Sequence, residues 1–110
     1  MIKYNKLIRD RIPEIIEESG NKCIVEEMDT DTYIQYLDQK LNEELAEYHA
    51  DKSIEELADL LEVIYAVVVA RGYSVEELEK VREEKAVKRG GFKKRLCLKG
   101  VIENGSKNVE

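Results

Sequence analysis

The sequence predicts a mainly α-helical fold, a helical bundle completed by dimerisation, with short extended segments near the two termini. Apolar residues recur at the three- and four-residue spacing of amphipathic helices through much of residues 31–71. Capping residues and glycines stand where these helices are expected to begin and end. The second central helix is apolar around most of its circumference, which a chain of 110 residues can hardly cover, so we expect a second subunit across a two-fold axis.

Composition and charge limit the classes of function open to the chain, which we expect to form one domain, residues 1–110. A net charge of −6 gives no general attraction to nucleic acid or to anionic membranes. The longest apolar run, residues 63–70, is too short to span a membrane, and the charged N-terminus does not suit a signal peptide. Cys23 and Cys97 lack metal-ligand spacing and are expected to be ordinary thiols. We therefore expect a cytoplasmic protein with no nucleic-acid or membrane partner.

One short helix is expected in the N-terminal part of the chain. Residues 1–12 are expected to be extended before it, and Pro13 suits its first turn. Gly20 can adopt the left-handed conformation that ends such a helix. Residues 23–28 are expected to be extended again, and residues 29–31 offer side-chain oxygens to cap the next helix.

Two long helices are expected in the centre of the chain. The first covers roughly residues 31–49, and the second covers about residues 53–71 and ends at Gly72. The apolar stripe of the first helix is narrow and consists of Ile34, Leu37, Leu41, Leu45 and Tyr48. The wider apolar surface of the second is typical of a helix that is buried on several sides.

The C-terminal part is expected to begin with a helix and to end without one. Ser74 and Glu77 form a capping box for a helix that runs to about Arg89. From residue 90 onward apolar and polar residues alternate, which indicates a strand or an extended arm. Residues 103–110 are expected to be a frayed tail.

Two pairs of carboxylates stand near the turn between the central helices. Glu44 and Glu47 belong to the first helix, and Glu56 and Asp59 belong to the second. In an antiparallel hairpin about the polar break at residues 49–53, Glu47 falls opposite Glu56 and Glu44 falls opposite Asp59. Carboxylates on facing helices repel one another unless they are protonated or bound to a cation. Oxygen ligands of this kind suit Mg²⁺, which keeps several waters and can bridge to phosphate.

A solvated acidic face is the alternative interpretation of the same residues. The chain has 24 acidic residues, so pairs at helical spacing are common, and Glu56 also completes a capping box with Ser53 that needs no metal. Helical phase places Glu44 and Glu56 nearest the apolar side of their helices. Glu43 points nearly opposite to the stripe and is a candidate ligand of a second metal or a candidate water-positioning residue.

Basic residues gather near the start and near the end of the chain. Lys88 and Arg89, followed by two glycines, could bring cations and backbone amides to a phosphate. They are equally well explained as capping residues, since cations followed by glycine are routine at a helix C-terminus. Both interpretations stay open.

Three blocks of the sequence resemble a known family. EELAE at 43–47 followed by ELAD at 56–59 resembles the ExxE…ExxD signature of the all-α nucleoside triphosphate pyrophosphohydrolases. This is the MazG-like superfamily, which includes phosphoribosyl-ATP pyrophosphohydrolase and dimeric dUTPases. YNKLIRDRIPEIIEE at 4–18 and KRGGFKKRLCL at 88–98 look like the ends of its phosphoribosyl-ATP pyrophosphohydrolase-like group.

The resemblance implies a hydrolase that forms a homodimer or a dimer of dimers. It implies Mg²⁺, with Mn²⁺ as a substitute, and hydrolysis of a nucleoside triphosphate between the α and β phosphates to a monophosphate and pyrophosphate. The implied metal ligands are Glu44, Glu47, Glu56 and Asp59, and Glu43 is implied as an auxiliary ligand or water-positioning base. The implied substrate contacts are Lys6, Arg9, Lys85 and Arg89. Because the gap between the acidic pairs is shorter here than in many members, the base preference stays open.

Three functions therefore remain to be separated. The first is the nucleotide pyrophosphatase just described, with the clearing of non-standard nucleotides as one form of it. The second is phosphoribosyl-ATP pyrophosphohydrolase of histidine biosynthesis. The third is a non-catalytic helical dimeric binding module whose acidic residues are merely solvated.

Overall fold

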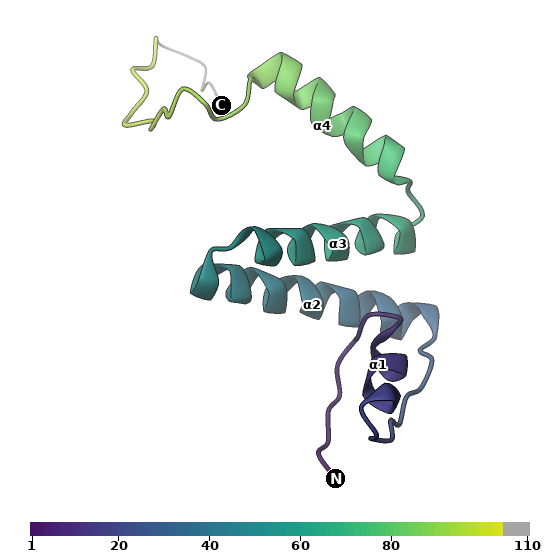
Figure 1. Cartoon of the computed structure of the whole chain (residues 1–110). Helices are drawn as coiled ribbons and strands as arrows, with labels where there is room; N and C mark the ends of the chain where they lie inside the picture. The colour runs from purple at the N-terminus through teal and green to yellow at the C-terminus, as the bar shows by residue number, and fades with distance from the viewer. Residues whose placement is uncertain (105–110) are drawn as a thin grey trace. The chain divides into compact units, whose positions relative to one another are not determined.

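The computed structural model describes residues 1–104, and among these it contains four helices and no strand (Figure 1). The helices are α1 (Ile12–Glu18), α2 (Thr30–Asp51), α3 (Ile54–Ala70) and α4 (Val75–Arg89). The prediction of a mainly α-helical fold is confirmed. The chain divides into two compact units, Met1–Leu78 and Glu79–Glu110, which are described one at a time.

In the first unit, α1 begins and ends at the residues that the sequence indicates. Pro13 stands in its first turn, where a missing backbone N–H is not needed. Gly20 has a φ of +92°, and the Asn21 N–H donates to the Ile16 carbonyl at 3.3 Å, so the helix ends in a Schellman motif. The stretches before and after α1 that were expected to be extended carry no helix or strand.

The centre of the first unit is the hairpin of α2 and α3, which run antiparallel and side by side (Figure 1). The Asp29 side chain caps α2 by accepting the Thr32 N–H at 2.8 Å. Lys52, with a φ of 57°, ends α2, and Ser53 immediately caps α3. This short connection holds the end of α2 against the start of α3. It therefore brings the two acidic pairs of the sequence to the same end of the hairpin.

The apolar surface of the first unit is incompletely covered. The most buried apolar side chains are Leu37 on α2, 2% exposed, and Val63 on α3, 9% exposed. Other large apolar residues of α3 remain exposed, namely Ile54, Leu57, Leu61 and Val69. Within the first unit α3 is therefore covered only in part, and the second subunit that was inferred from the sequence stays a prediction.

In the second unit, the last three turns of α4 lead to a segment without regular structure. The start of α4 belongs to the first unit, where the Glu77 N–H donates to Ser74 Oγ at 3.1 Å in the predicted capping box. The strand considered from residue 90 onward is absent from the part of the chain described, up to residue 104. The Arg95 N–H instead closes a turn on the Phe92 carbonyl at 3.2 Å, and alternation of apolar residues alone does not supply a partner strand.

Residues 103 and 104 are exposed and irregular, and residues 105–110 lie outside the described residues. No helix within residues 1–104 is long and apolar enough to cross a membrane. The single-domain boundary of residues 1–110 stays a prediction.

Candidate functional site

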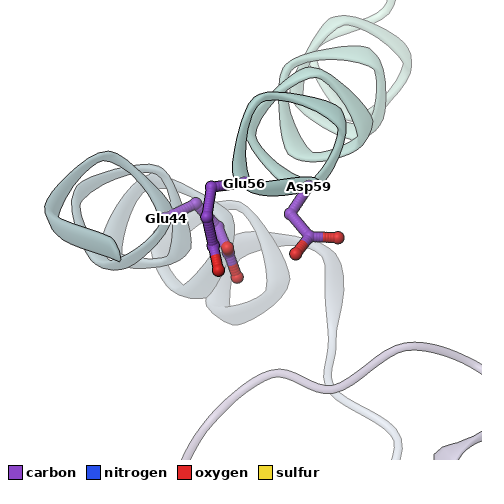
Figure 2. A group of neighbouring side chains, drawn as sticks. All are labelled: Glu44, Glu56 and Asp59. Carbon is purple, nitrogen blue, oxygen red and sulfur yellow. The ribbon is translucent and has the colours of Figure 1, made fainter. Parts of the chain in front are cut away.

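Three of the predicted metal ligands meet at the turn end of the α2–α3 hairpin. Glu44 on α2 and Glu56 and Asp59 on α3 each offer a carboxylate oxygen, and these oxygens lie within 4.8 Å of one another. Figure 2 shows the carboxylates of Glu44 and Glu56 next to each other, with that of Asp59 on the same side of the hairpin. We call these three residues the acidic cluster. The antiparallel hairpin brings its members together across the two helices, as the spacing of the pairs predicts.

Two oxygens of the acidic cluster are buried without compensation. Glu44 is 7% exposed and is the buried charged residue of the described chain. Its Oε2 atom and the Oε2 atom of Glu56 are shielded from solvent and have no hydrogen-bond partner within residues 1–104. We call these two atoms the shielded oxygens. A buried, unpaired polar atom costs free energy of folding, so the site favours a bound proton or a bound cation.

The pKa values of two cluster members move in the direction that this burial requires. Burial raises the pKa of Glu44, and the nearby carboxylate of Glu47 raises it further, against the opposing effect of Lys40. Burial also raises the pKa of Glu56, and the charges of Glu47 and Asp59 add to this effect. Both pKa values are raised first by burial and then by the neighbouring negative charges.

Glu47 and Glu43 stand at the edge of the acidic cluster. Glu47 is exposed and is not one of the three residues whose oxygens meet, although its charge acts on both Glu44 and Glu56. Glu43 lies beside the cluster, where Lys40 Nζ is 3.2 Å from its Oε1 atom. Three of the four predicted carboxylates offer oxygens within 4.8 Å of one another, and Glu47 lies close enough to raise the pKa of Glu44 and of Glu56 by its charge and by a side-chain hydrogen bond.

The capping role of Glu56 does not compete with a role in the cluster. The Glu56 backbone N–H donates to Ser53 Oγ at 3.3 Å, which is the cap that the sequence predicts. Its side chain points instead toward the cluster, where one carboxylate oxygen is shielded (Figure 2). The cap therefore explains the position of Glu56 at the start of α3 and leaves the burial of its carboxylate unexplained.

Two cations face the acidic cluster from different elements. Arg9 Nη2 lies 2.6 Å from Asp59 Oδ1, although the two residues are fifty positions apart in the chain. Lys40 Nζ lies 3.5 Å from Glu44 Oε1 as well as contacting Glu43. Sequence reasoning missed Lys40. Its position four residues before Glu44, on the same face of one helix, is the signal that could have found it.

A cavity of about 400 Å³ opens beside these charged groups. Arg9, Lys40, Glu44 and Asp59 all line it. Its other walls come from residues 7–11, which we call the N-terminal segment, and from side chains of the hairpin that include Tyr33, Leu37 and Val63. A larger hollow of about 1160 Å³ shares the same four charged residues and extends along the N-terminal segment and α1. Glu44 and Asp59 of the acidic cluster therefore border a space that can hold a small molecule.

The remaining predicted substrate contacts have different surroundings. Lys6 lines the larger hollow, and its Nζ lies 5.4 Å from the centre of the Tyr4 ring. Lys85 and Arg89 are exposed residues on the part of α4 that belongs to the second unit. Of the four predicted basic residues, Arg9 is the one that contacts a member of the acidic cluster.

The residues of the cluster fit a hard divalent cation. Such an ion takes carboxylate oxygens and keeps waters in its remaining positions, and the three carboxylates leave such positions free. The shielded oxygens are acceptors without donors, as the ligands of an ion are. Glu44, Glu56 and Asp59 are thus the residues that could hold Mg²⁺ or Mn²⁺.

Comparison with known proteins identifies one partial relative and no family. A stretch of 45 residues, 41% of the chain, is 47% identical to an uncharacterized protein of Mycolicibacterium smegmatis (strain ATCC 700084 / mc(2)155). The match covers 46% of that protein, so the chain spans about half the length of the curated relative. No family model matches the chain, and no solved structure matches it.

Proposed function

We propose that the chain is a Mg²⁺-dependent nucleoside triphosphate pyrophosphohydrolase of the MazG-like superfamily. It cleaves between the α and β phosphates and releases a nucleoside monophosphate and pyrophosphate. One observation carries the proposal: the shielded oxygens of Glu44 and Glu56 lie close to Asp59, and Glu44 and Asp59 line a cavity that Arg9 and Lys40 also line. The resemblance of the acidic motif and of both chain ends to that superfamily supports it.

The acidic cluster and the two cations that face it each have a role in this proposal. Glu44, Glu56 and Asp59 would hold the metal, and Glu47, whose charge acts on Glu44 and Glu56, would be a further ligand. When bound, Mg²⁺ supplies a Lewis acid for a phosphate oxygen and lowers the pKa of a coordinated water. Arg9 and Lys40 bind phosphate oxygens, which a protein of net charge −6 attracts only where cations are concentrated.

Glu43 is held in place by Lys40, with which it forms an ion pair of 3.2 Å. In the proposed reaction its carboxylate orients the attacking water, the role that the family resemblance implies for it. A carboxylate fixed by a neighbouring ammonium loses less freedom when it takes up such a position than a solvated one does.

The proposal includes a homodimer, or a dimer of dimers, and a cytoplasmic location. The exposed apolar side chains of α3 support a second copy as their cover, because contiguous exposed apolar surface is uncommon on a monomer. Isologous pairing about a two-fold axis is the commonest way to cover such a surface.

A nucleotide panel with Mg²⁺ or Mn²⁺ tests the proposed function. Released products are resolved as monophosphate or diphosphate, and phosphoribosyl-ATP is one of the substrates, so the histidine-biosynthesis alternative is tested in the same assay. We expect monophosphate and pyrophosphate from at least one triphosphate, and a loss of at least about a hundredfold in kcat for Glu56→Gln. Glu55→Gln, an exposed neighbour on α3, is the matched control and is expected to retain activity. Equal inactivity of the wild type and Glu56→Gln toward every substrate contradicts the proposal.

A further inference from the structure

Arg9 has a fixed backbone and a movable side chain. Its carbonyl accepts the Ile12 N–H at 3.1 Å in the turn that leads into α1. Its side chain is 58% exposed and crosses to Asp59, which is 41% exposed. Exposed ion pairs of this kind contribute little to stability, so the pair can open at small cost.

The carboxylate of Asp59 has two roles, one as the partner of Arg9 and one as a member of the acidic cluster. Its Oδ1 atom accepts from the Arg9 guanidinium, and an oxygen of Asp59 also belongs to the acidic cluster. A guanidinium and a divalent cation on one carboxylate repel each other. Arg9 and a divalent cation therefore compete for Asp59.

Lys40, the other cation that faces the acidic cluster, is held more firmly than Arg9. It lies on α2 one turn from its two partners Glu43 and Glu44, and its side chain is only 17% exposed. Rearrangement of Lys40 would leave Glu44 buried without a counter-ion. Arg9 has no such constraint, because it is held by one contact to a half-exposed partner.

The released side chain of Arg9 already stands at the cavity. Arg9 lines the space of about 400 Å³ beside the acidic cluster. A phosphate bound there offers two oxygens, which the planar guanidinium binds with two parallel hydrogen bonds. Such a phosphate is a stronger partner for Arg9 than a carboxylate already engaged by a cation.

We propose that Arg9 exchanges partners at this site: it pairs with Asp59 in the absence of a divalent cation and binds a substrate phosphate in its presence. The identity of the phosphate ligand rests on the proposed function. The exchange makes binding of the cation and binding of the phosphate mutually dependent, since the cation frees the residue that the phosphate needs. Arg9 is thus a counter-ion in one state and a substrate-binding residue in the other.

Two binding measurements test the exchange without requiring any turnover. Free Mn²⁺ is titrated with protein and detected by electron paramagnetic resonance, and pyrophosphate binding is then measured with and without Mn²⁺. We expect Arg9→Gln to bind Mn²⁺ roughly two- to fivefold more tightly than the wild type, because the competing pair is gone. We expect its affinity for pyrophosphate in the presence of Mn²⁺ to fall about tenfold, the effect of a lost charge-assisted hydrogen bond.

Arg71→Gln is the matched control. Arg71 Nη2 lies 2.9 Å from Asp38 Oδ2, and each side chain of that pair is 49% exposed, so it resembles the Arg9 pair away from the acidic cluster. Arg71→Gln is expected to change neither affinity. Arg9→Lys, which keeps the charge, is expected to restore the weaker Mn²⁺ affinity of the wild type and part of the pyrophosphate affinity.

Specific results overturn the exchange. It is wrong if Arg9→Gln leaves Mn²⁺ affinity unchanged or weakens it, or if pyrophosphate binding falls no more than in Arg71→Gln. If the expected shifts are found and no triphosphate is hydrolysed, the role of Arg9 stands and the proposed hydrolase activity fails. If a triphosphate is hydrolysed and the shifts are missing, the activity stands and the exchange fails.

Discussion

The α2–α3 hairpin and the segment that follows α4 both concentrate charge, and they do so with opposite consequences. In the hairpin, the side chains of Glu44 and Lys40 are largely buried, and the shielded oxygens are out of contact with water. In residues 90–104, the lysines and arginines are exposed and stand among exposed apolar side chains such as Phe92. A run of exposed like charges does not by itself make a binding or catalytic site. Burial of charges on facing helices can make one, because it shifts their pKa values and leaves hydrogen-bond acceptors without donors.

The largest expected difference between the two regions is in packing. Leu37 is 2% exposed between α2 and α3, whereas Leu96 is 85% exposed. We expect Leu37→Ala to lower the free energy of unfolding by about 2–5 kcal/mol, through lost burial and the cavity left behind. Leu96→Ala is expected to change it by less than about 0.5 kcal/mol. Urea denaturation of both variants measures the difference, and equal effects would show that residues 90–104 contribute to the core in solution.

The second expected difference is in how much a lysine side chain contributes to the free energy of unfolding. Lys40→Gln removes a counter-ion from the buried carboxylate of Glu44, and we expect a loss of about 1–3 kcal/mol in the free energy of unfolding. Lys85→Gln changes an exposed lysine on α4 and is expected to alter stability by less than about 0.5 kcal/mol. Both variants are compared by urea denaturation in EDTA. A loss in Lys40→Gln no greater than that in Lys85→Gln would mean that Glu44 does not depend on its ion pair.

The smallest expected effect is a dependence of stability on pH. Because the folded state raises the pKa of Glu44 and Glu56, it binds more protons than the unfolded chain between their ordinary and raised values. The metal-free protein should therefore gain stability as the pH falls from neutrality toward the raised values, with no further gain from these groups below their ordinary values. Thermal melts in EDTA over this range measure it, and the gain should shrink in Glu44→Gln. A metal-free stability that decreases steadily as the pH is lowered through this window would contradict this expectation.

The sequence predicts the local features of the fold well, because those features depend on neighbouring residues. Residues that begin or end a helix influence only the adjacent helical turn, and each of them stands where it was expected. They are Pro13, Gly20, Ser53, Gly72 and Ser74. Alternation after residue 90 left a strand or an extended arm open, and residues 90–104 contain no strand, since a strand requires a partner that no local pattern supplies.

The sequence predicts the members of the site that follow from helical periodicity, and it misses contacts that do not. Helical phase identified Glu44 and Glu56 as the acids nearest the apolar side, because burial along a helix follows its period. The contact of Arg9 with Asp59 joins an irregular segment to α3 across fifty residues, and periodicity carries no information about such a pair. Lys40 was missed because an (i, i+4) pair of lysine and glutamate is usually a solvated contact.

We propose that Glu44, Glu56 and Asp59 form a divalent-cation site, and a thermal shift with Mg²⁺ is the direct test of this site. An ion that binds only the folded protein stabilises it by about 2.7 kcal/mol at a hundred times its dissociation constant. We predict that Mg²⁺ raises the Tm of the wild type and of Glu55→Gln and leaves that of Glu56→Gln nearly unchanged. Equal shifts in all three proteins, or no shift in any of them, would contradict the claim.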